Sequence, residues 1–168
     1  MISELQVSTI LFRSGPAAKL FTPLLNKAMR RYEINNKPRI AAFMAQIGYE
    51  SGELRYLRER DHAFCVGNTL EVQGDVLRYG GRGLIHIQGF NNYRDCGTAL
   101  ELDLVTHPQW LELPEYACLS AAWYWHSKGL NHLADQGQFE AITRRIKGSL
   151  HGQTERLALY QLALSVLV

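Results

Sequence analysis

Cysteine is scarce in this sequence of 168 residues, and the three that occur, Cys65, Cys96 and Cys118, lie far apart. An odd number of widely spaced cysteines argues against a disulfide framework and is typical of synthesis in a reducing cytoplasm. Long apolar runs are also missing, and none approaches the roughly 20 residues of a transmembrane helix. The sequence therefore predicts no insertion into a membrane.

An excess of charge of one sign is equally missing, since 18 basic and 16 acidic residues give a net charge of +2. This balance is too small to indicate a nucleic-acid-binding protein, although it would help the protein approach an anionic polymer such as a bacterial wall. The opening stretch, MISELQVSTILFRSG, lacks the basic start and the unbroken apolar run of a secretion signal. We therefore expect synthesis in the cytoplasm, with another factor releasing the protein to any target outside.

What is present is the composition of a soluble globular protein, with 46% apolar and 20% charged residues. No internal repeat, linker or low-complexity run divides the chain, so we expect residues 1–168 to form one mainly helical domain. Apolar periodicity predicts helices over residues 16–32, 114–128, 138–147 and 154–168. In the last of these, the residues expected on one buried face are Leu157, Tyr160, Leu164 and Leu167.

Neither a metal ion nor a cofactor is predicted. His62 and Cys65 have a spacing seen in metal sites, and His86 could join them in space, but these are too few ligands. Nucleophilic catalysis by serine or cysteine has no supporting motif either, because no nucleophile elbow or papain-like block occurs.

The most informative stretch, RIAAFMAQIGYESGELRYLRER, occupies residues 39–60. Its apolar residues recur at the spacing of a core-facing helix, at Ile40, Phe43, Met44 and Ile47. Asparagines at positions 35 and 36 can cap the start of this helix, and Gly52 can end it.

Glu50 falls at the edge of that apolar stripe, in the last turn of the predicted helix. Burial there would disfavour the charged carboxylate and raise its pKa, as a proton donor near neutral pH requires. Glu59 follows on a separate segment that could return across a cleft. Two carboxylates in unlike surroundings indicate a general acid and a general base.

Each glutamate also has a simpler structural interpretation. Glu50 could be a helix-terminal carboxylate paired with an arginine, and Glu59 lies in the charge run RYLRERD, where it could be an ion-pair partner. Glu53 is too close to Glu50 to act across a substrate. The alternative bases are Asp61, Glu71 and Asp75.

A second stretch, YGGRGLIHIQGFNNY at residues 79–93, has three glycines around Arg82. They allow a sharp turn and a close approach of the backbone to a ligand. The spacing matches neither the Walker pattern nor the dinucleotide fingerprint, which argues against a phosphate-binding loop. A plain glycine-rich turn into a helix is the alternative. Three tryptophans are expected mostly in the core, although one could form a wall on which a sugar stacks, namely Trp110, Trp123 or Trp125.

Three blocks in order, FMAQIGYESGELRYLRE, YGGRGLIHIQGFNNY and AITRRIKGSLHGQTERLALY, resemble the family 19 glycoside hydrolases. This family contains plant-type chitinases and phage endolysins that cut peptidoglycan, and the resemblance covers roughly residues 38–160. It implies a mainly α, lysozyme-like, two-lobed helical domain with a substrate cleft and at most a small β-hairpin. It also implies an inverting mechanism.

Residue by residue, the resemblance implies that Glu50 is the general acid, which protonates the glycosidic oxygen, and that Glu59 is the general base, which activates the attacking water. Inversion needs room for that water, so the two carboxyl groups should lie about 6.5 to 9.5 Å apart. The positions that match cleft-lining or substrate-binding residues of the family are Tyr79, Arg82, His86, Gln88, Asn92, Lys147 and Arg156.

Four positions depart from the family pattern. Tyr49 replaces a histidine before the acid, and His86 replaces a glutamine. Gln88 replaces the serine or threonine that helps hold the attacking water, and its longer amide would have to reposition that water. Lys147 replaces an asparagine and cannot accept a hydrogen bond.

The expected function is that of a peptidoglycan-degrading endolysin of the muramidase or glucosaminidase type, acting on β-1,4 bonds as a monomer without a cofactor. Such a protein would be made in a host cytoplasm and reach the wall after release by a holin or another route. Three alternatives remain: a chitinase of the same family, a lytic transglycosylase that uses Glu50 alone, and a non-catalytic saccharide-binding relative.

Overall fold

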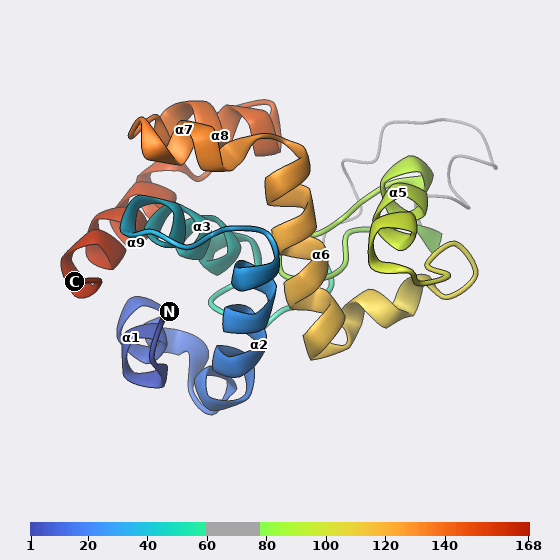
Figure 1. Cartoon of the computed structure of the whole chain (residues 1–168), viewed down its shortest axis with the longest axis horizontal. Coiled ribbons are helices and arrows are strands. Elements are labelled where there is room, and N and C mark those ends of the chain that lie inside the picture. The colour runs from blue at the N-terminus through green and yellow to red at the C-terminus, as the bar shows by residue number, and fades with distance from the viewer. Residues whose placement is uncertain (60–77) are drawn as a thin grey trace.

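The structure, a computed structural model, describes residues 1–59 and 78–168 as an assembly of helices (Figure 1). The helices are α1 (Glu4–Ile10), α2 (Ala17–Arg31), α3 (Lys37–Glu50), α5 (Phe90–Leu100), α6 (Pro114–Ser127), α7 (Leu130–Asp135), α8 (Phe139–Lys147) and α9 (Gln153–Val166), with 3-10 turns η1 (Phe12–Ser14) and η2 (Pro108–Glu112). The prediction of a mainly helical fold is confirmed. Within these two ranges, no helix is long and apolar enough to cross a bilayer.

Helix α3 lies in the middle of the core. The Asn36 side chain accepts a hydrogen bond of 2.9 Å from the backbone N–H of Arg39, which caps the helix as predicted. Every residue from Ile40 to Gly48 is buried, so α3 is covered on all sides rather than along one stripe. Helices α7 and α9 pack against it, and Figure 1 shows α3 and α9 next to each other.

Helix α3 ends at Glu50 because the chain then turns sharply. Gly52, Glu53 and Leu54 have positive φ angles of 56°, 61° and 71°, a left-handed conformation that cannot continue a right-handed helix. Glu50 therefore occupies the last helical position, as the sequence predicted.

Helix α6 stands between two groups of helices. Figure 1 shows α1, α2, α3, α7, α8 and α9 on one side of α6, and α5 on the other. Helix α6 packs against α2 in the larger group and against α5 and η2 in the smaller one. This division agrees with the two lobes that the resemblance implied. In place of a hairpin, the described residues form isolated β-bridges of Arg82 with Arg58 and with Ile87.

The last helix, α9, buries a different face from the predicted one. Arg156 and Ala163 are fully buried, whereas Leu157 is 38% exposed. The predicted buried face is therefore wrong at Leu157. In this turn of α9 the residue that faces the core is Arg156. A buried arginine requires polar partners inside the protein, and these lie at the end of α3.

Candidate active site

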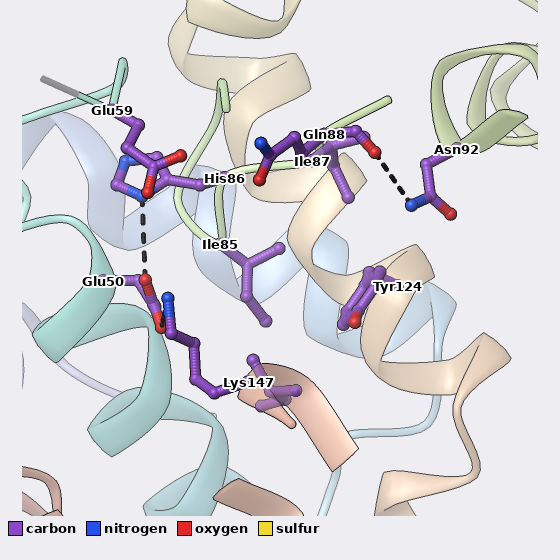
Figure 2. A pocket seen from close by; sticks show the side chains of 10 residues that line it. Glu50, Glu59, Ile85, His86, Ile87, Gln88, Asn92, Tyr124 and Lys147 are labelled. Atoms are coloured by element: carbon purple, nitrogen blue, oxygen red, sulfur yellow. Dashed lines mark hydrogen bonds and ion pairs between the residues drawn. The ribbon is translucent and has the colours of Figure 1, made fainter. Parts of the chain in front are cut away.

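A cavity of about 280 Å³ lies where the two groups of helices meet. Figure 2 shows its walls, to which α3, α5, α6, α8 and the turn before α5 contribute. The lining residues are Glu50, Glu59, Ile85, His86, Ile87, Gln88, Asn92, Tyr124, Ile146 and Lys147. Six of the nine predicted site residues thus share one pocket, and three, Tyr79, Arg82 and Arg156, do not belong to this lining.

Glu50 is almost completely enclosed, with only 8% of its side chain exposed. Its Oε1 accepts a hydrogen bond of 2.6 Å from the guanidinium of Arg156, and the ammonium of Lys147 lies 3.9 Å from the same oxygen. The Nδ1 of His86 lies 3.7 Å from Oε2, beyond ordinary hydrogen-bond length, so this contact is an ionic attraction when the imidazole is protonated. Basic groups from three separate segments therefore converge on one carboxylate.

Arg156 acts from behind the pocket and has no exposed surface. Besides Glu50, it donates to the side-chain oxygen of Gln46 at 2.5 Å and to the carbonyl of His151 at 3.0 Å. Its guanidinium carbon also lies 4.1 Å from the centre of the Tyr49 ring. Since these partners enclose the guanidinium, we expect Arg156 to fix Glu50 rather than to contact a substrate.

The expectation of a raised pKa at Glu50 is wrong. Burial alone would raise the pKa of this carboxyl, but His86, Arg156 and Lys147 together lower it from the ordinary 4.5 to about 2. The apolar periodicity that predicted burial could not reveal these basic partners, which come from distant parts of the chain. In this arrangement Glu50 is ionised at neutral pH.

Glu59 enters the pocket from the irregular segment after α3. Its backbone N–H donates to the carbonyl of Gly81 at 2.8 Å, which ties the segment to the glycine-rich turn. Gly81 also leaves the space that the carboxylate fills, because a Cβ at this position would lie 2.5 Å from Oε2 of Glu59. The prediction that Glu50 and Glu59 face a common cleft is confirmed, while their chemical roles stay predictions.

Arg82 and Tyr79 lie behind the turn. Arg82 is 5% exposed and donates to a carboxylate oxygen of Glu112 at 3.0 Å and to the carbonyl of Arg78 at 2.6 Å. Tyr79 is equally buried, and its hydroxyl donates to the carbonyl of Val105 at 2.8 Å. Because these polar groups are used within the fold, the predicted substrate-binding role of both residues has no support in their position. We expect them to stabilise the turn.

The opposite end of the pocket is formed by Gln88, Asn92 and Tyr124. The amide of Asn92 donates to the backbone carbonyl of Gln88 at 2.9 Å, so the start of α5 holds the end of the turn. Tyr124 of α6 was missed by the sequence interpretation, which considered tryptophans for an aromatic wall. Its two neighbours in the chain, Trp123 and Trp125, were considered, and only the helical phase distinguishes Tyr124 from them.

Some sequence predictions lie outside the described residues. They concern the alternative bases and the weak metal-like spacing, at Asp61, His62, Cys65, Glu71 and Asp75.

A comparison with models of known protein families finds no match. A Haemophilus influenzae protein described as a glycosyl hydrolase family 19 domain-containing protein is 31% identical over 161 residues, covering 75% of this chain and 78% of the relative. An endochitinase of Arabidopsis thaliana is 36% identical over 114 residues, which cover 67% of this chain but 40% of the plant protein. Among solved structures, chitinase C from Streptomyces griseus matches with a TM-score of 0.80 and 23% identity, covering 99% of this chain and 76% of that chain. The last likeness shows a common fold.

Proposed function

Since this chain belongs to glycosyl hydrolase family 19, a family of glycoside hydrolases, we propose that it hydrolyses the β-1,4 bonds of peptidoglycan in the manner of an endolysin. The observation that carries this proposal is that Glu50 and Glu59 reach one pocket from separate segments (Figure 2). The side chain of Glu50 is buried and fixed at the end of α3, whereas Glu59 is half-buried on an irregular segment. Two carboxyl groups in such unlike surroundings suit the roles of acid and base.

In the proposed reaction, Glu50 gives a proton to the glycosidic oxygen while the bond to the anomeric carbon breaks. Glu59 removes a proton from a water molecule, whose oxygen attacks the same carbon from the opposite face. Each product then carries one new hydroxyl group, and the anomeric configuration is inverted. This route needs a gap of about 6.5 to 9.5 Å between the two carboxyl groups, because the water must fit between Glu59 and the sugar.

Lys147 supports peptidoglycan over chitin as the substrate. The ammonium group lines the pocket and is partly exposed, where the family pattern has a neutral asparagine. Peptidoglycan carries carboxylates on its peptide stems, whereas chitin is uncharged, so a cation in the pocket favours the acidic polymer. The small positive net charge of +2 acts in the same direction.

A chitinase is the second candidate, and it is favoured by the names of the relatives. The Arabidopsis thaliana protein is an endochitinase, and the Streptomyces griseus protein is chitinase C. Incubation with purified peptidoglycan and with chitin oligomers, followed by mass spectrometry of the products, separates the two candidates. We expect new reducing ends from peptidoglycan, whereas cleavage of chitin alone would establish the chitinase.

The roles of the two carboxylates are tested by Glu50→Gln and Glu59→Gln. Each variant should lower kcat by about 100- to 10,000-fold, because general acid and general base catalysis contribute rate factors of this size. Glu53→Gln is the matched control, since Glu53 lies three residues from Glu50 but pairs with Arg13 instead of lining the pocket. It should retain full activity.

The products distinguish the remaining alternatives. Retention of activity in Glu59→Gln, together with 1,6-anhydro ends, would identify a lytic transglycosylase. Binding of saccharide without any cleavage at high protein concentration would identify a non-catalytic relative. Full activity of the Glu50→Gln variant would contradict the proposal that Glu50 is the general acid.

We also propose that the protein reaches the wall from the cytoplasm with the help of a holin. Cysteine usage motivates this proposal, because Cys96 and Cys118 are buried and unpaired, which is typical of proteins made in a reducing cytoplasm. Expression in a bacterial host should cause lysis when a holin is co-expressed and leave the cells intact without one. Lysis in the absence of the holin would contradict this route.

A further inference from the structure

A general acid must hold a proton before the reaction begins, and Glu50 is poorly placed to hold one. Arg156 donates to its Oε1, and Lys147 lies near the same oxygen. Both side chains favour the ionised carboxylate. A proton for the reaction therefore has to come from another group beside Oε2.

His86 is the residue at that oxygen. Its Nδ1 lies 3.7 Å from Oε2 of Glu50, and only 10% of its side chain is exposed. Its second ring nitrogen, Nε2, is buried and has no hydrogen-bond partner among the described residues. A buried ring nitrogen without a partner is costly, which indicates that this imidazole is kept in place for something other than stability.

The backbone shows the same constraint. His86 has a φ angle of 60°, a left-handed conformation that is uncommon for residues other than glycine. The turn is closed by two hydrogen bonds between Arg82 and Ile87, of 3.1 and 2.9 Å, which impose this conformation on the residue between them. A side chain in this position is aimed at the end of α3, as Figure 2 shows.

His86 is also next to Glu59. A Cβ on Gly81 would lie 2.5 Å from Oε2 of Glu59 and 3.0 Å from the Cβ of His86, so both side chains flank the same glycine. The imidazole therefore has one carboxylate of the proposed pair at its Nδ1 and the other close by. A histidine between two carboxylates is suited to carry protons, because imidazole gains and loses a proton near neutral pH.

We propose that His86 is the proton store of the general acid: its Nδ1 holds a proton that passes to Oε2 of Glu50 as the glycosidic bond breaks. This inference rests on the proposed function. His86 is thus a positioning and proton-carrying residue that acts through Glu50.

The protons balance over one turnover. His86 gives one proton to Glu50, which gives one to the leaving-group oxygen, and Glu59 takes one from the attacking water. A proton that returns from Glu59 to the imidazole restores all three groups. No oxidant, reductant or further reactant is needed.

Titratable groups from several described elements surround the imidazole. The groups concerned are Glu50 of α3, Glu59, Tyr124 of α6, Lys147 of α8 and Arg156 of α9.

The first test removes the imidazole with His86→Gly, because glycine readily adopts a φ angle of 60° and the turn should survive. At pH 7 we expect kcat to fall by about tenfold or more while KM changes little, since the imidazole assists chemistry and not binding. The remaining activity should move to lower pH, where Glu50 takes a proton directly from solution. Added imidazole should restore activity at pH 7.

The matched control is His132→Gly, because His132 is an exposed histidine of α7 that lies outside the pocket. It should keep the wild-type pH profile and respond to no added imidazole. A His86→Gly variant that loses the same fraction of activity at every pH, without rescue by imidazole, would show a purely structural role and overturn the inference.

A second test does not depend on activity or on the folding of His86→Gly. Nitrogen NMR of the wild-type imidazole near neutral pH should show protons on both ring nitrogens, whereas Glu50→Gln should show a proton on one. If the imidazole has the same protonation in both proteins, His86 does not store the proton for Glu50. If the wild type cleaves no bond, the proposed function itself is refuted. The failure of the proton-store inference and the failure of the proposed function are therefore distinguishable.

Discussion

Glu50 stands at the end of a helix that is buried along almost its whole length, whereas Glu59 stands on a stretch without regular structure. The carboxylate of Glu50 is held directly, by a buried guanidinium at 2.6 Å. The position of Glu59 is held through its backbone, by one hydrogen bond to Gly81, and by the space that this glycine leaves. The wall of the pocket that carries Glu50 is thus fixed by an ion pair, and the wall that carries Glu59 is fixed by a backbone hydrogen bond and by the space at Gly81.

This difference suits the two proposed roles. A general acid has to keep its direction toward one oxygen atom, and a packed helix provides that precision. A general base has to accommodate a water molecule and a sugar in the same gap, which tolerates a less rigid support. The two walls should therefore fail in different ways when their supports are removed.

The largest effect is expected from Arg156→Met, which removes the charge behind Glu50 and leaves its carboxylate buried. Loss of one partner of a buried ion pair costs about 3–5 kcal/mol of unfolding free energy, and Gln46 also loses a hydrogen bond here. Urea unfolding at pH 7 measures this loss. Hydrolysis should fall as well, because Glu50 loses its fixed direction.

Two further variants show whether charge is the cause. Arg156→Met combined with Glu50→Gln should recover part of the lost stability, since no buried charge is then left without a partner. Arg13→Met is the control, because Arg13 pairs with Glu53 while 66% of its side chain is exposed, and it should cost less than about 1 kcal/mol. If Arg156→Met unfolds at the wild-type urea concentration, charge does not hold this wall.

The wall of Glu59 is tested by Gly81→Ala. The new methyl group would lie 2.5 Å from Oε2 and 2.9 Å from Cβ of Glu59, so the carboxylate and the backbone that carries it must both shift. Since a displacement of about 1 Å can cost about 100-fold in rate, we expect kcat of the folded variant to fall by about 10- to 100-fold.

Gly137→Ala is the matched control, and it should lower stability without lowering kcat. Gly137 has a φ angle of 69° and nothing within 4 Å of an added Cβ, so alanine strains the backbone without touching the pocket. It should lower the unfolding free energy by about 1 kcal/mol and leave kcat unchanged. Equal losses of activity in both variants would mean that the shape of the turn at Gly81 has no special role.

The sequence predicted those parts of the fold that local patterns determine. Apolar periodicity and a capping asparagine gave α3 its course, and Gly52 indicated its end at Glu50. The resemblance of three blocks predicted that Glu59 and the turn before α5 line the same cleft as Glu50, and residues 85–88 do line that pocket. No local sequence pattern could predict this proximity.

The environment of Glu50 could not be predicted, because it depends on residues far along the chain. Periodicity selected Leu157 for the buried face of α9, yet Arg156 is the residue inside. A hydropathy pattern treats an arginine as exposed and gives no sign of the carboxylate that compensates it. The direction of the Glu50 pKa shift was wrong for the same reason: pairing with an arginine was considered as an alternative, but the sequence did not identify Arg156 as the partner.

The smallest expected effect concerns Lys147, the outermost of the cations around Glu50. Burial alone would raise the pKa of that carboxyl, and His86, Arg156 and Lys147 lower it to about 2, below its ordinary 4.5. The ionised carboxylate therefore stabilises the folded protein fully above pH 4.5, and this contribution is lost as the pH falls toward 2. Lys147→Asn raises the pKa and so removes part of that contribution.

At pH 7 the Lys147→Asn variant should be less stable than the wild type by less than about 1 kcal/mol, because 30% of the lysine side chain is exposed and solvent weakens the attraction. Near pH 2 the difference should be clearly smaller, since Glu50 is then partly protonated in both proteins. Urea unfolding at the two pH values measures it. In a Glu50→Gln background the same substitution should have no pH-dependent effect. A difference of the same size at both pH values, or one that depends on pH in that background, would show that Lys147 stabilises the protein through something other than the charge of Glu50.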